Sequence, residues 1–357
     1  MTLNILITGA SGFLGSKLAT KLLEQNHNVY LLVRNAKKIE HLMNRDHNNM
    51  EGQVVVLEGE LTEERLGLNK SVLNQLKGKI DAIYHTAALL SFDDLKKDDV
   101  FRVNVEGTRH VLDVAKMIGV QKFIHVSTAY TLGDLVIGEE TLYPETNRFN
   151  NYYEESKSKA EHLVMSYQEY FDVSVMRPAI IIGDSETGEA STTFGLYGII
   201  RAIELLKKRA MKKGNTEAVF RLIGNKETVS NLVPVDYVVK VLILGLRYGK
   251  TNTVYNITNP NPPSNQLIIE TILKSLGTNM VKIVPHQDAH LLTEDEINFN
   301  KPLQVFNKYL NCSKSFKDEN TRTLLNQEQD SALNMNADML SRIIGGFIER
   351  KKVMVQK

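Results

Sequence analysis

Three kinds of side chain that can hold or move a proton follow one another in a fixed order along this chain. Ser127 and Thr128 supply hydroxyl groups, and Tyr153 and Lys157 follow them. Because residues four apart on a helix share a face, the phenol and the ammonium should lie on the same side. A tyrosine with its ordinary pKa near about 10 exchanges protons poorly at neutral pH, and a neighbouring ammonium lowers that pKa. The set therefore indicates proton transfer.

This set of residues suits the reduction of a carbonyl group. Hydride addition builds negative charge on the carbonyl oxygen, so a proton donor must stand beside that oxygen. We expect Tyr153 to donate the proton and Thr128 to hold the same oxygen through a hydrogen bond. Lys157 would tune Tyr153 or bind the ribose of a nicotinamide cofactor. Each residue taken singly is also common in a structural role, so the order along the chain is what favours catalysis.

A glycine-rich turn near the N-terminus is suited to the phosphates of such a cofactor. Its spacing is G-x-x-G-x-x-G, a variant of the commoner G-x-G-x-x-G. Gly9 can adopt a tight strand-to-helix turn, Gly12 lets the main chain approach a pyrophosphate, and Gly15 lets the helix pack closely on the sheet. The helix N-terminus then faces the phosphates; an ordinary loop is the alternative. The residues assigned here to cofactor binding are Thr8, Gly9, Ser11, Gly12, Phe13, Leu14 and Gly15.

The end of the second predicted strand bears on which dinucleotide binds. An NAD site usually has an Asp or Glu there, about 20 residues past the glycines, to hold the ribose 2′-hydroxyl. This chain has Arg34 instead. A guanidinium pairs with a phosphate, so Arg34 favours NADPH over NADH. A solvated arginine at a strand end is the alternative.

The elements that must position these residues alternate along the first half of the chain. Apolar runs predict strands over 3–7, 29–33, 54–57, 80–84, 122–126 and 173–176, the last ended by Arg177 and Pro178. Helical periodicity predicts helices from 13 to near 26, over 95–117 and over 152–170. This alternation predicts an α/β fold, a Rossmann-type doubly wound parallel sheet with right-handed crossovers.

Beyond Gly183 the alternation stops, which indicates a second region. The pattern predicts a polar loop over 184–193, helices over 194–213 and 232–248, and a strand over 253–257 before a proline-rich break. We expect residues 1–182 with 231–258 to form an NADP-binding Rossmann domain. Residues 183–230 with 259–357 would form a smaller substrate-binding cap at the carboxyl edge of the sheet, where ligands of open α/β sheets bind.

Composition excludes several classes of protein. Among 357 residues, 43 Lys and Arg balance 42 Asp and Glu, so net charge does not recruit nucleic acid. The single cysteine, Cys312, excludes an internal disulfide and a cysteine-rich metal site. His85 and His125 lack metal-ligand neighbours, so we expect core or supporting roles and no metal. The chain shows neither a signal peptide nor a membrane span, and we expect a soluble, cytoplasmic protein.

With these residues in hand, the chain resembles the extended short-chain dehydrogenase/reductase superfamily. Within it, the chain is most similar to the thioester reductase and fatty acyl-CoA reductase branch. The resemblance covers about residues 1 to 260. It is carried by the glycine turn, Ala87 and Ala88, Asn104, Ser127 and Thr128, Tyr153 and Lys157, Arg177 and Pro178, and the stretches 29–34, 58–68, 83–88, 177–188 and 232–237.

The resemblance implies a Rossmann domain with a C-terminal substrate cap and NADPH as the cofactor. It implies that the turn glycines serve the pyrophosphate, and that Arg34 serves the 2′-phosphate. Glu60 stands where relatives usually have Asp, and Glu60 and Leu61 would lie beside the adenine. Ala87 and Ala88 would lie on the phosphoribose side, whereas Asn104 would bridge backbone groups. The chemistry would be carried by Thr128, Tyr153 and Lys157.

The resulting hypothesis is the NADPH-dependent reduction of an acyl thioester, bound to CoA or to a carrier protein, to an aldehyde or an alcohol. One alternative keeps the fold and changes the substrate, to an aldehyde, a ketone or a sugar nucleotide that is epimerised or dehydrated. Another is a dinucleotide-sensing protein without catalysis, which would not need the Thr/Tyr/Lys set. A basic run over 207–213 would contact CoA or carrier phosphates, or form a solvated helix face. The oligomeric state stays open.

Overall fold

The computed structural model describes residues 1–43, 52–192, 195–214 and 217–355, and these fold into two compact units. Unit 1 comprises Met1–Ala179, Val238–Thr258 and Phe316–Ala332. Unit 2 comprises Ile180–Tyr237, Asn259–Ser315 and Leu333–Lys357. The units differ from the predicted domain boundaries mainly in two segments: 231–237 belongs to unit 2, and 316–332 belongs to unit 1.

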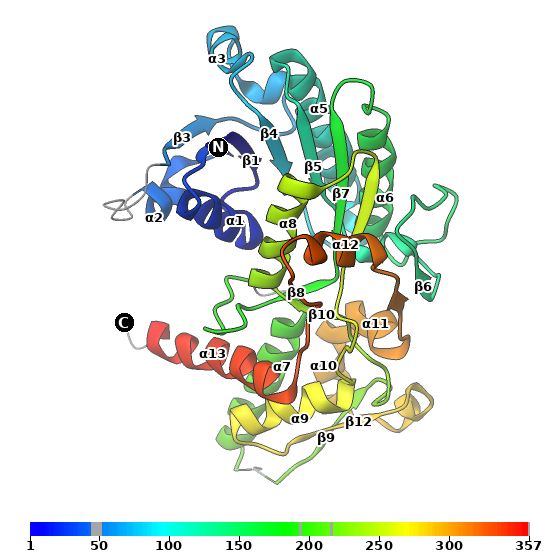
Figure 1. Ribbon diagram of the computed structural model, residues 1–357. Coiled ribbons are helices and arrows are strands. Elements are labelled where there is room, and N and C mark those ends of the chain that lie inside the picture. Colours follow the sequence, from blue (N-terminus) through cyan, green and yellow to red (C-terminus); the bar gives the residue numbers. More distant parts are fainter. Residues whose placement is uncertain (44–51, 193–194, 215–216, 356–357) are drawn as a thin grey trace. The chain divides into compact units, whose positions relative to one another are not determined.

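A seven-stranded parallel sheet forms the centre of unit 1 and confirms the predicted doubly wound α/β fold (Figure 1). The chain builds outward from β1 in both directions, so the order of connection reverses between β1 and β4. Ligands of such sheets bind beyond the strand carboxyl ends at this reversal. In spatial order the strands are β11 (Thr253–Ile257), β7 (Asp172–Pro178), β5 (Lys122–Val126), β4 (Ala82–His85), β1 (Asn4–Thr8), β2 (Asn28–Val33) and β3 (Val54–Glu58).

Helices cover both faces of this sheet, which is why its central strands are apolar throughout. Ile5, Leu6 and Ile7 of β1 are fully buried. On one face pack α3 (Lys70–Leu76), α5 (Gly107–Ile118) and α6 (Tyr152–Met165). The other helices of this unit are α1 (Phe13–Glu24), α2 (Glu40–Met43), α4 (Lys97–Phe101), most of α8 (Val235–Tyr248) and α12 (Glu319–Gln327).

Three predicted helices differ from the structure. The helix predicted over 152–170 ends at Met165. The helix predicted over 95–117 is divided into a 3₁₀ turn at Asp94–Lys96, α4, a π-helical turn at Arg102–Glu106, and α5. The helix predicted over 232–248 begins only at Val235, because Leu232–Pro234 is a strand, β10. The apolar residues of β10 are compatible with a helix or a strand. In the structure they form a strand because they pair with β8 (Ile180–Ile182).

Unit 2 is built from small parallel strand pairs and helices. β8 pairs with β10, and β9 (Phe220–Ile223) pairs with β12 (Val281–Val284). Its helices are α7 (Leu196–Lys212), α9 (Asn265–Leu276), α10 (Glu294–Asn300), α11 (Asn307–Asn311) and α13 (Ala337–Val355). Elsewhere β6 (Ile137–Gly138) pairs with β13 (Ser315–Phe316). The predicted start of α7 at Phe194, and the end of the loop at Thr193, lie outside the described residues.

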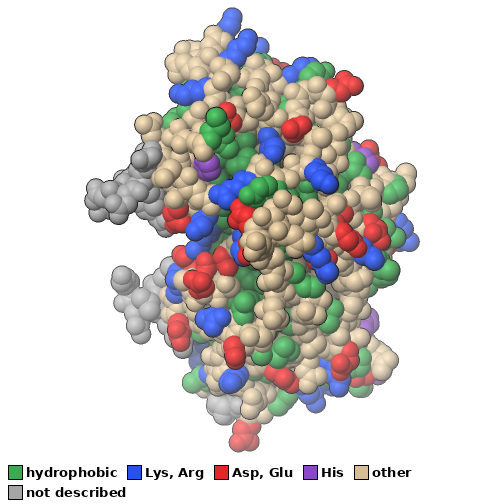
Figure 2. Space-filling model, in the orientation of Figure 1, with side chains coloured by type: hydrophobic (Ala, Val, Ile, Leu, Met, Phe, Trp, Pro, Cys, Tyr) green, Lys and Arg blue, Asp and Glu red, His purple; other side chains and the backbone are tan. Residues whose placement is uncertain are grey.

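The surface drawn in Figure 2 carries Lys and Arg side chains interspersed with Asp and Glu side chains. This mixture agrees with the near-zero net charge of the sequence, +1 at pH 7. Within the described ranges, no helix combines the length and the apolar character needed to cross a bilayer.

Candidate active site

The glycine turn connects β1 to α1 at the carboxyl edge of the sheet. Gly9 has a φ of +74°, and its carbonyl accepts a hydrogen bond of 2.9 Å from Gly12 N–H. α1 then begins at Phe13 without a side-chain cap on its first turn. Ser11 and Gly12 are exposed. The turn therefore presents main-chain N–H groups and the positive end of a helix, which is the arrangement that binds phosphate.

Steric contacts explain two of the three glycines in this turn. A Cβ on Gly9 would lie 2.7 Å from Ala87 N, and one on Gly15 would lie 2.3 Å from Gly9 O. Both positions are closed to any side chain. A Cβ on Gly12 would meet only Gly9 O, at 3.2 Å. Gly9 and Gly15 are therefore required by packing, whereas the open side of Gly12 leaves room for a ligand.

Arg34 follows β2 and is largely exposed. Its Nε lies 3.9 Å from Oε2 of Glu60, and the side chains are 76% and 33% exposed. Such a loose, exposed ion pair contributes little to stability and exchanges readily for another anion. The structure thus brings these two predicted cofactor residues together. Both residues lie just beyond the carboxyl ends of the neighbouring strands β2 and β3.

The remaining predicted cofactor residues lie along the same edge. Leu61 packs against Gly107 of α5, and its carbonyl accepts a hydrogen bond of 2.8 Å from His110. Ala87 is half-buried beside Gly9, and Ala87 N–H donates to Thr8 Oγ1 at 3.4 Å. Ala88, the next residue, is exposed.

Thr128 stands just beyond the carboxyl end of β5 and is mostly buried. Its Oγ1 accepts a hydrogen bond of 3.3 Å from Tyr130 N–H, which caps the 3₁₀ turn at Ala129–Leu132. The adjacent Ser127 Oγ is buried and has no hydrogen-bond partner among the described residues. Thr128 therefore has a structural role as well as the predicted catalytic one.

Lys157 is anchored to the same end of β5 from the facing helix α6. The side chain is 1% exposed, and its Nζ donates to Val126 O at 2.7 Å. Nζ also lies 3.3 Å from His125 Nε2. Burial lowers the pKa of Lys157 to about 8, against the opposing effect of the Glu161 carboxylate. An ammonium has three donors, so one is left beyond these contacts for a phenol or a ribose hydroxyl.

Tyr153 lies one helical turn before Lys157 and is half-buried, with its ring 6.3 Å from that of Phe92. Burial raises the pKa of Tyr153, and the neighbouring Glu154 carboxylate raises it further. The sequence led us to expect a lowered pKa. The difference arises because desolvation and the Glu154 carboxylate both disfavour the phenolate.

A network of buried hydrogen bonds joins the carboxyl ends of β1 and β4 to α5. Thr108 Oγ1 donates to Asn104 O at 2.7 Å, so it accepts from His85 Nε2 at 2.9 Å. His85 Nδ1 then accepts from Thr8 Oγ1 at 2.7 Å. Burial, together with the charge of Lys157, lowers the pKa of His85 to about 3, so this histidine is neutral. Both histidines thus have the expected supporting roles. Thr108 was missed, although its helical spacing from Asn104 is visible in sequence.

Asn104 ties the π-helical turn to two other segments. Its side chain accepts from Leu89 N–H at 2.7 Å and donates to Leu89 O at 3.1 Å. Its Nδ2 also donates to Ser156 Oγ at 3.0 Å, and Ser156 in turn donates to Tyr153 O. The bridging of backbone groups implied for Asn104 is thus observed, and Ser156 extends it to the helix that carries Tyr153 and Lys157.

Comparison with known proteins places this geometry in a family. The model of the male sterility protein family matches residues 7–242. Fatty acyl-CoA reductase 1 of Xenopus laevis is 28% identical over 307 residues, which cover 71% of this chain. The chain spans 57% of the length of that relative.

Solved structures show the same fold. The terminal R domain from the myxalamid PKS-NRPS biosynthetic pathway matches with a TM-score of 0.80 and 23% identity, covering 98% of this chain and 91% of that one. DesIV, a dTDP-glucose 4,6-dehydratase from Streptomyces venezuelae solved with NAD and TYD bound, matches with a TM-score of 0.70 and 20% identity, covering 98% of each chain. These comparisons confirm the resemblance drawn from the sequence. The chain belongs to the male sterility protein family, within the extended short-chain dehydrogenase/reductases.

Proposed function

We propose that this chain is an NADPH-dependent oxidoreductase that reduces the carbonyl group of an acyl thioester. The observation that carries the proposal is the buried anchoring of Lys157 at the carboxyl end of β5. That anchoring gathers an ammonium, the Thr128 hydroxyl and the α6 segment bearing Tyr153 at the edge where the glycine turn also lies. A protein that merely senses a dinucleotide would need only the turn.

The residues present fit a dinucleotide. The exposed Gly12 and the uncapped start of α1 are suited to the pyrophosphate, and Arg34 to the 2′-phosphate. The third Lys157 donor is suited to a ribose hydroxyl. When bound, NADPH supplies the hydride that makes the reaction a reduction. Arg34 is the reason for proposing the phosphorylated form, because a guanidinium gains a partner from the 2′-phosphate that NADH lacks.

The side chains then act on the substrate oxygen. As negative charge grows on the carbonyl oxygen, Tyr153 Oη donates its proton there and Thr128 Oγ1 donates a hydrogen bond. The Lys157 ammonium stabilises the phenolate that remains. A thioester reduced in this way becomes a hemithioacetal, whose C–S bond breaks to release a thiol and an aldehyde. A covalent acyl-enzyme is not required, so the exposed Cys312 has no part in the reaction.

Support for the thioester comes from the fatty acyl-CoA reductase relative and the family match. The likeness to a sugar-nucleotide dehydratase favours a second candidate, oxidation and dehydration of a sugar nucleotide on the same Thr/Tyr/Lys set. The two candidates share a fold and differ in the substrate.

The discriminating experiment follows NADPH absorbance with panels of acyl-CoA thioesters and free aldehydes. Sugar nucleotides are supplied with NADP+ or NAD+ and their products are separated by chromatography, because dehydration returns the hydride to the sugar and leaves cofactor absorbance unchanged. We expect oxidation of NADPH and release of free thiol with at least one acyl-CoA. Turnover of free aldehydes without any turnover of thioesters would refute the thioester proposal. Turnover of sugar nucleotides alone would favour the second candidate.

A further inference from the structure

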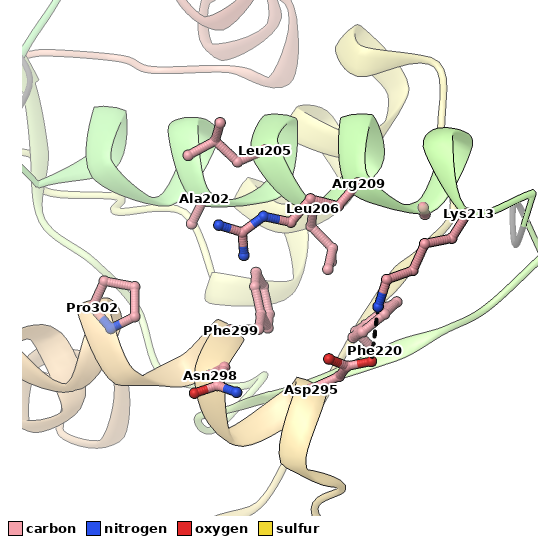
Figure 3. A pocket seen from close by; sticks show the side chains of 11 residues that line it. Ala202, Leu205, Leu206, Arg209, Lys213, Phe220, Asp295, Asn298, Phe299 and Pro302 are labelled. Atoms are coloured by element: carbon pink, nitrogen blue, oxygen red, sulfur yellow. Dashed lines mark ion pairs between the residues drawn. The ribbon is translucent and has the colours of Figure 1, made fainter.

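Unit 2 contains a groove that shares no residue with the site described above. It lies between α7 and the segment from α10 to Pro302, with a volume of about 490 Å³ (Figure 3). This is within the range of about 300–1,000 Å³ that is usual for small-molecule sites. Polar and apolar atoms contribute about equally to its surface, and the apolar residues include Ala202, Leu205, Leu206, Phe220, Phe299 and Pro302.

Arg209 is one of three charged residues that line the groove, with Lys213 and Asp295. Figure 3 shows its side chain running back along α7, with the guanidinium on the side of Ala202. Among the described residues, no Asp or Glu forms an ion pair with Arg209. Two neighbouring cations of α7 are engaged: Lys208 pairs with Glu204 at 3.5 Å, and Lys207 donates to Leu276 O at 2.6 Å. Arg209 thus offers its donors to a ligand.

The charge at the other end of the groove limits what that ligand can be. Lys213 and Asp295 form an ion pair of 3.7 Å there, so they add no net charge. A phosphate monoester carries about −1.5 to −2 at pH 7. Arg209 alone would balance only part of that charge, and the remainder would repel the Asp295 carboxylate. A carboxylate carries one charge and matches the planar guanidinium with two parallel hydrogen bonds.

We propose that this groove binds the ionised form of a medium-chain fatty acid, with the carboxylate on Arg209 and the hydrocarbon chain on the apolar lining. The chain would cover Leu205, an apolar side chain that is 38% exposed in the structure. The site is separate from the Thr128, Tyr153 and Lys157 set and does not rest on the proposed reductase activity.

The test is calorimetric titration of the full-length protein with decanoate and, separately, with 1-decanol at pH 7. Decanoate should bind, and 1-decanol should bind at least about tenfold more weakly, since it lacks the charge. Arg209→Gln should weaken decanoate binding at least about tenfold and leave 1-decanol binding unchanged. Leu205→Glu should also abolish decanoate binding, because it places a carboxylate beside the ligand.

Lys208→Gln is the matched control, because it removes a neighbouring cation that does not line the groove. It should leave decanoate affinity within about twofold of the unsubstituted protein. Absence of binding, equal affinity in Arg209→Gln, or an equal loss in Lys208→Gln would each overturn the proposal. The substituted side chains are exposed, and equal thermal unfolding of the variants excludes a folding defect. The titration needs neither cofactor nor turnover, so a failure of the reductase proposal would not alter its result.

Discussion

Lys157 shows how burial and hydrogen bonding oppose each other at a single residue. An ammonium removed from water loses hydration, which brings the pKa of this group down to about 8. Val126 O and His125 replace part of that hydration. Burial also lowers the pKa of His125, so the imidazole stays neutral and accepts from the ammonium. The pKa of Lys157 is therefore only slightly above neutral pH, so its ammonium loses its proton under mildly alkaline conditions.

This balance predicts an alkaline limit to activity. The groups that face Lys157 are His125 on β5, His85 on β4 and Glu161 on its own helix. Below pH 8 the ammonium is charged and able to stabilise a phenolate; as pH rises through about 8 it loses its proton. We therefore expect kcat/KM for NADPH-dependent reduction to fall above that pH.

Substitution of His125 tests the origin of this limit. His125→Phe removes an acceptor from the charged lysine, so the alkaline limb should move to lower pH. His125→Gln restores an acceptor oxygen and should move the limb back toward its original position. Identical pH profiles for all three proteins would show that His125 does not influence Lys157.

Tyr153 is predicted to be the proton donor. Tyr153→Phe should lower kcat at least about 100-fold, because the oxyanion loses its acid, while the Kd of NADPH measured by fluorescence changes by less than about twofold. Tyr152→Phe is the matched control on the same helix. It keeps the ring over which Lys97 Nζ lies at 4.7 Å, and it should retain activity. Activity that survives in Tyr153→Phe would exclude this role.

Arg34 is predicted to select the cofactor. Arg34→Ala should weaken NADPH binding about tenfold through the loss of one charge-assisted contact, and should leave NADH binding almost unchanged. Lys37→Ala, an exposed cation shortly after Arg34, provides the control in the same equilibrium titration. An equal loss for both dinucleotides in Arg34→Ala would show that the guanidinium does not contact the 2′-phosphate.

At the scale of elements, α6 is held to β7 by a buried ion pair. Arg177 Nε and Nη2 donate to the two carboxylate oxygens of Glu161 at 2.8 and 2.6 Å, with both side chains at most 1% exposed. Arg177 Nη1 also donates to Glu139 O. The pair orients the helix that carries Tyr153 and Lys157. We therefore expect loss of this ion pair to lower the stability of the folded chain, and to lower activity only as a consequence.

Glu161→Gln should lower the free energy of unfolding by about 3–5 kcal/mol, because it leaves the Arg177 charge buried without its counter-charge. The measurement is urea denaturation followed by circular dichroism. Lys159→Gln breaks the partly exposed pair with Glu155 on the same helix and should cost about 1 kcal/mol or less. Equal midpoints for the two variants would contradict the importance given to the buried pair.

At the scale of the whole molecule, the proposed cofactor should stabilise the folded chain by mass action. At a concentration of NADPH 100 times its Kd, the gain is about 2.7 kcal/mol. We expect the thermal unfolding midpoint to rise steadily with NADPH, as measured by differential scanning fluorimetry. Gly12→Val should abolish this rise relative to its own midpoint without ligand, because it fills the open side of the turn. A midpoint that does not respond to NADPH would exclude tight binding.

Most of the fold follows from local patterns. Apolar runs of the right length identified the seven strands of the central sheet, because parallel strands covered on both faces must be apolar throughout. The same criterion misplaced Leu232–Pro234, since a short apolar run fits a helix or a strand equally well. It also joined the helices on either side of the π-helical turn at Arg102–Glu106, because helical periodicity barely changes across one such turn.

The sequence by itself determined the order and spacing of the glycine turn, Thr128, Tyr153 and Lys157, and with them the family. The spacing is local, because the glycines share one turn and Tyr153 and Lys157 share one helix; the order of the three segments is read directly along the chain. Only the tertiary structure decided that Lys157 is buried against Val126 and His125, and that the pKa of Tyr153 is raised. It also decided that Arg209 lines a groove in unit 2. Burial and charge at these residues depend on partners far away in the chain, and no local spacing encodes those partners.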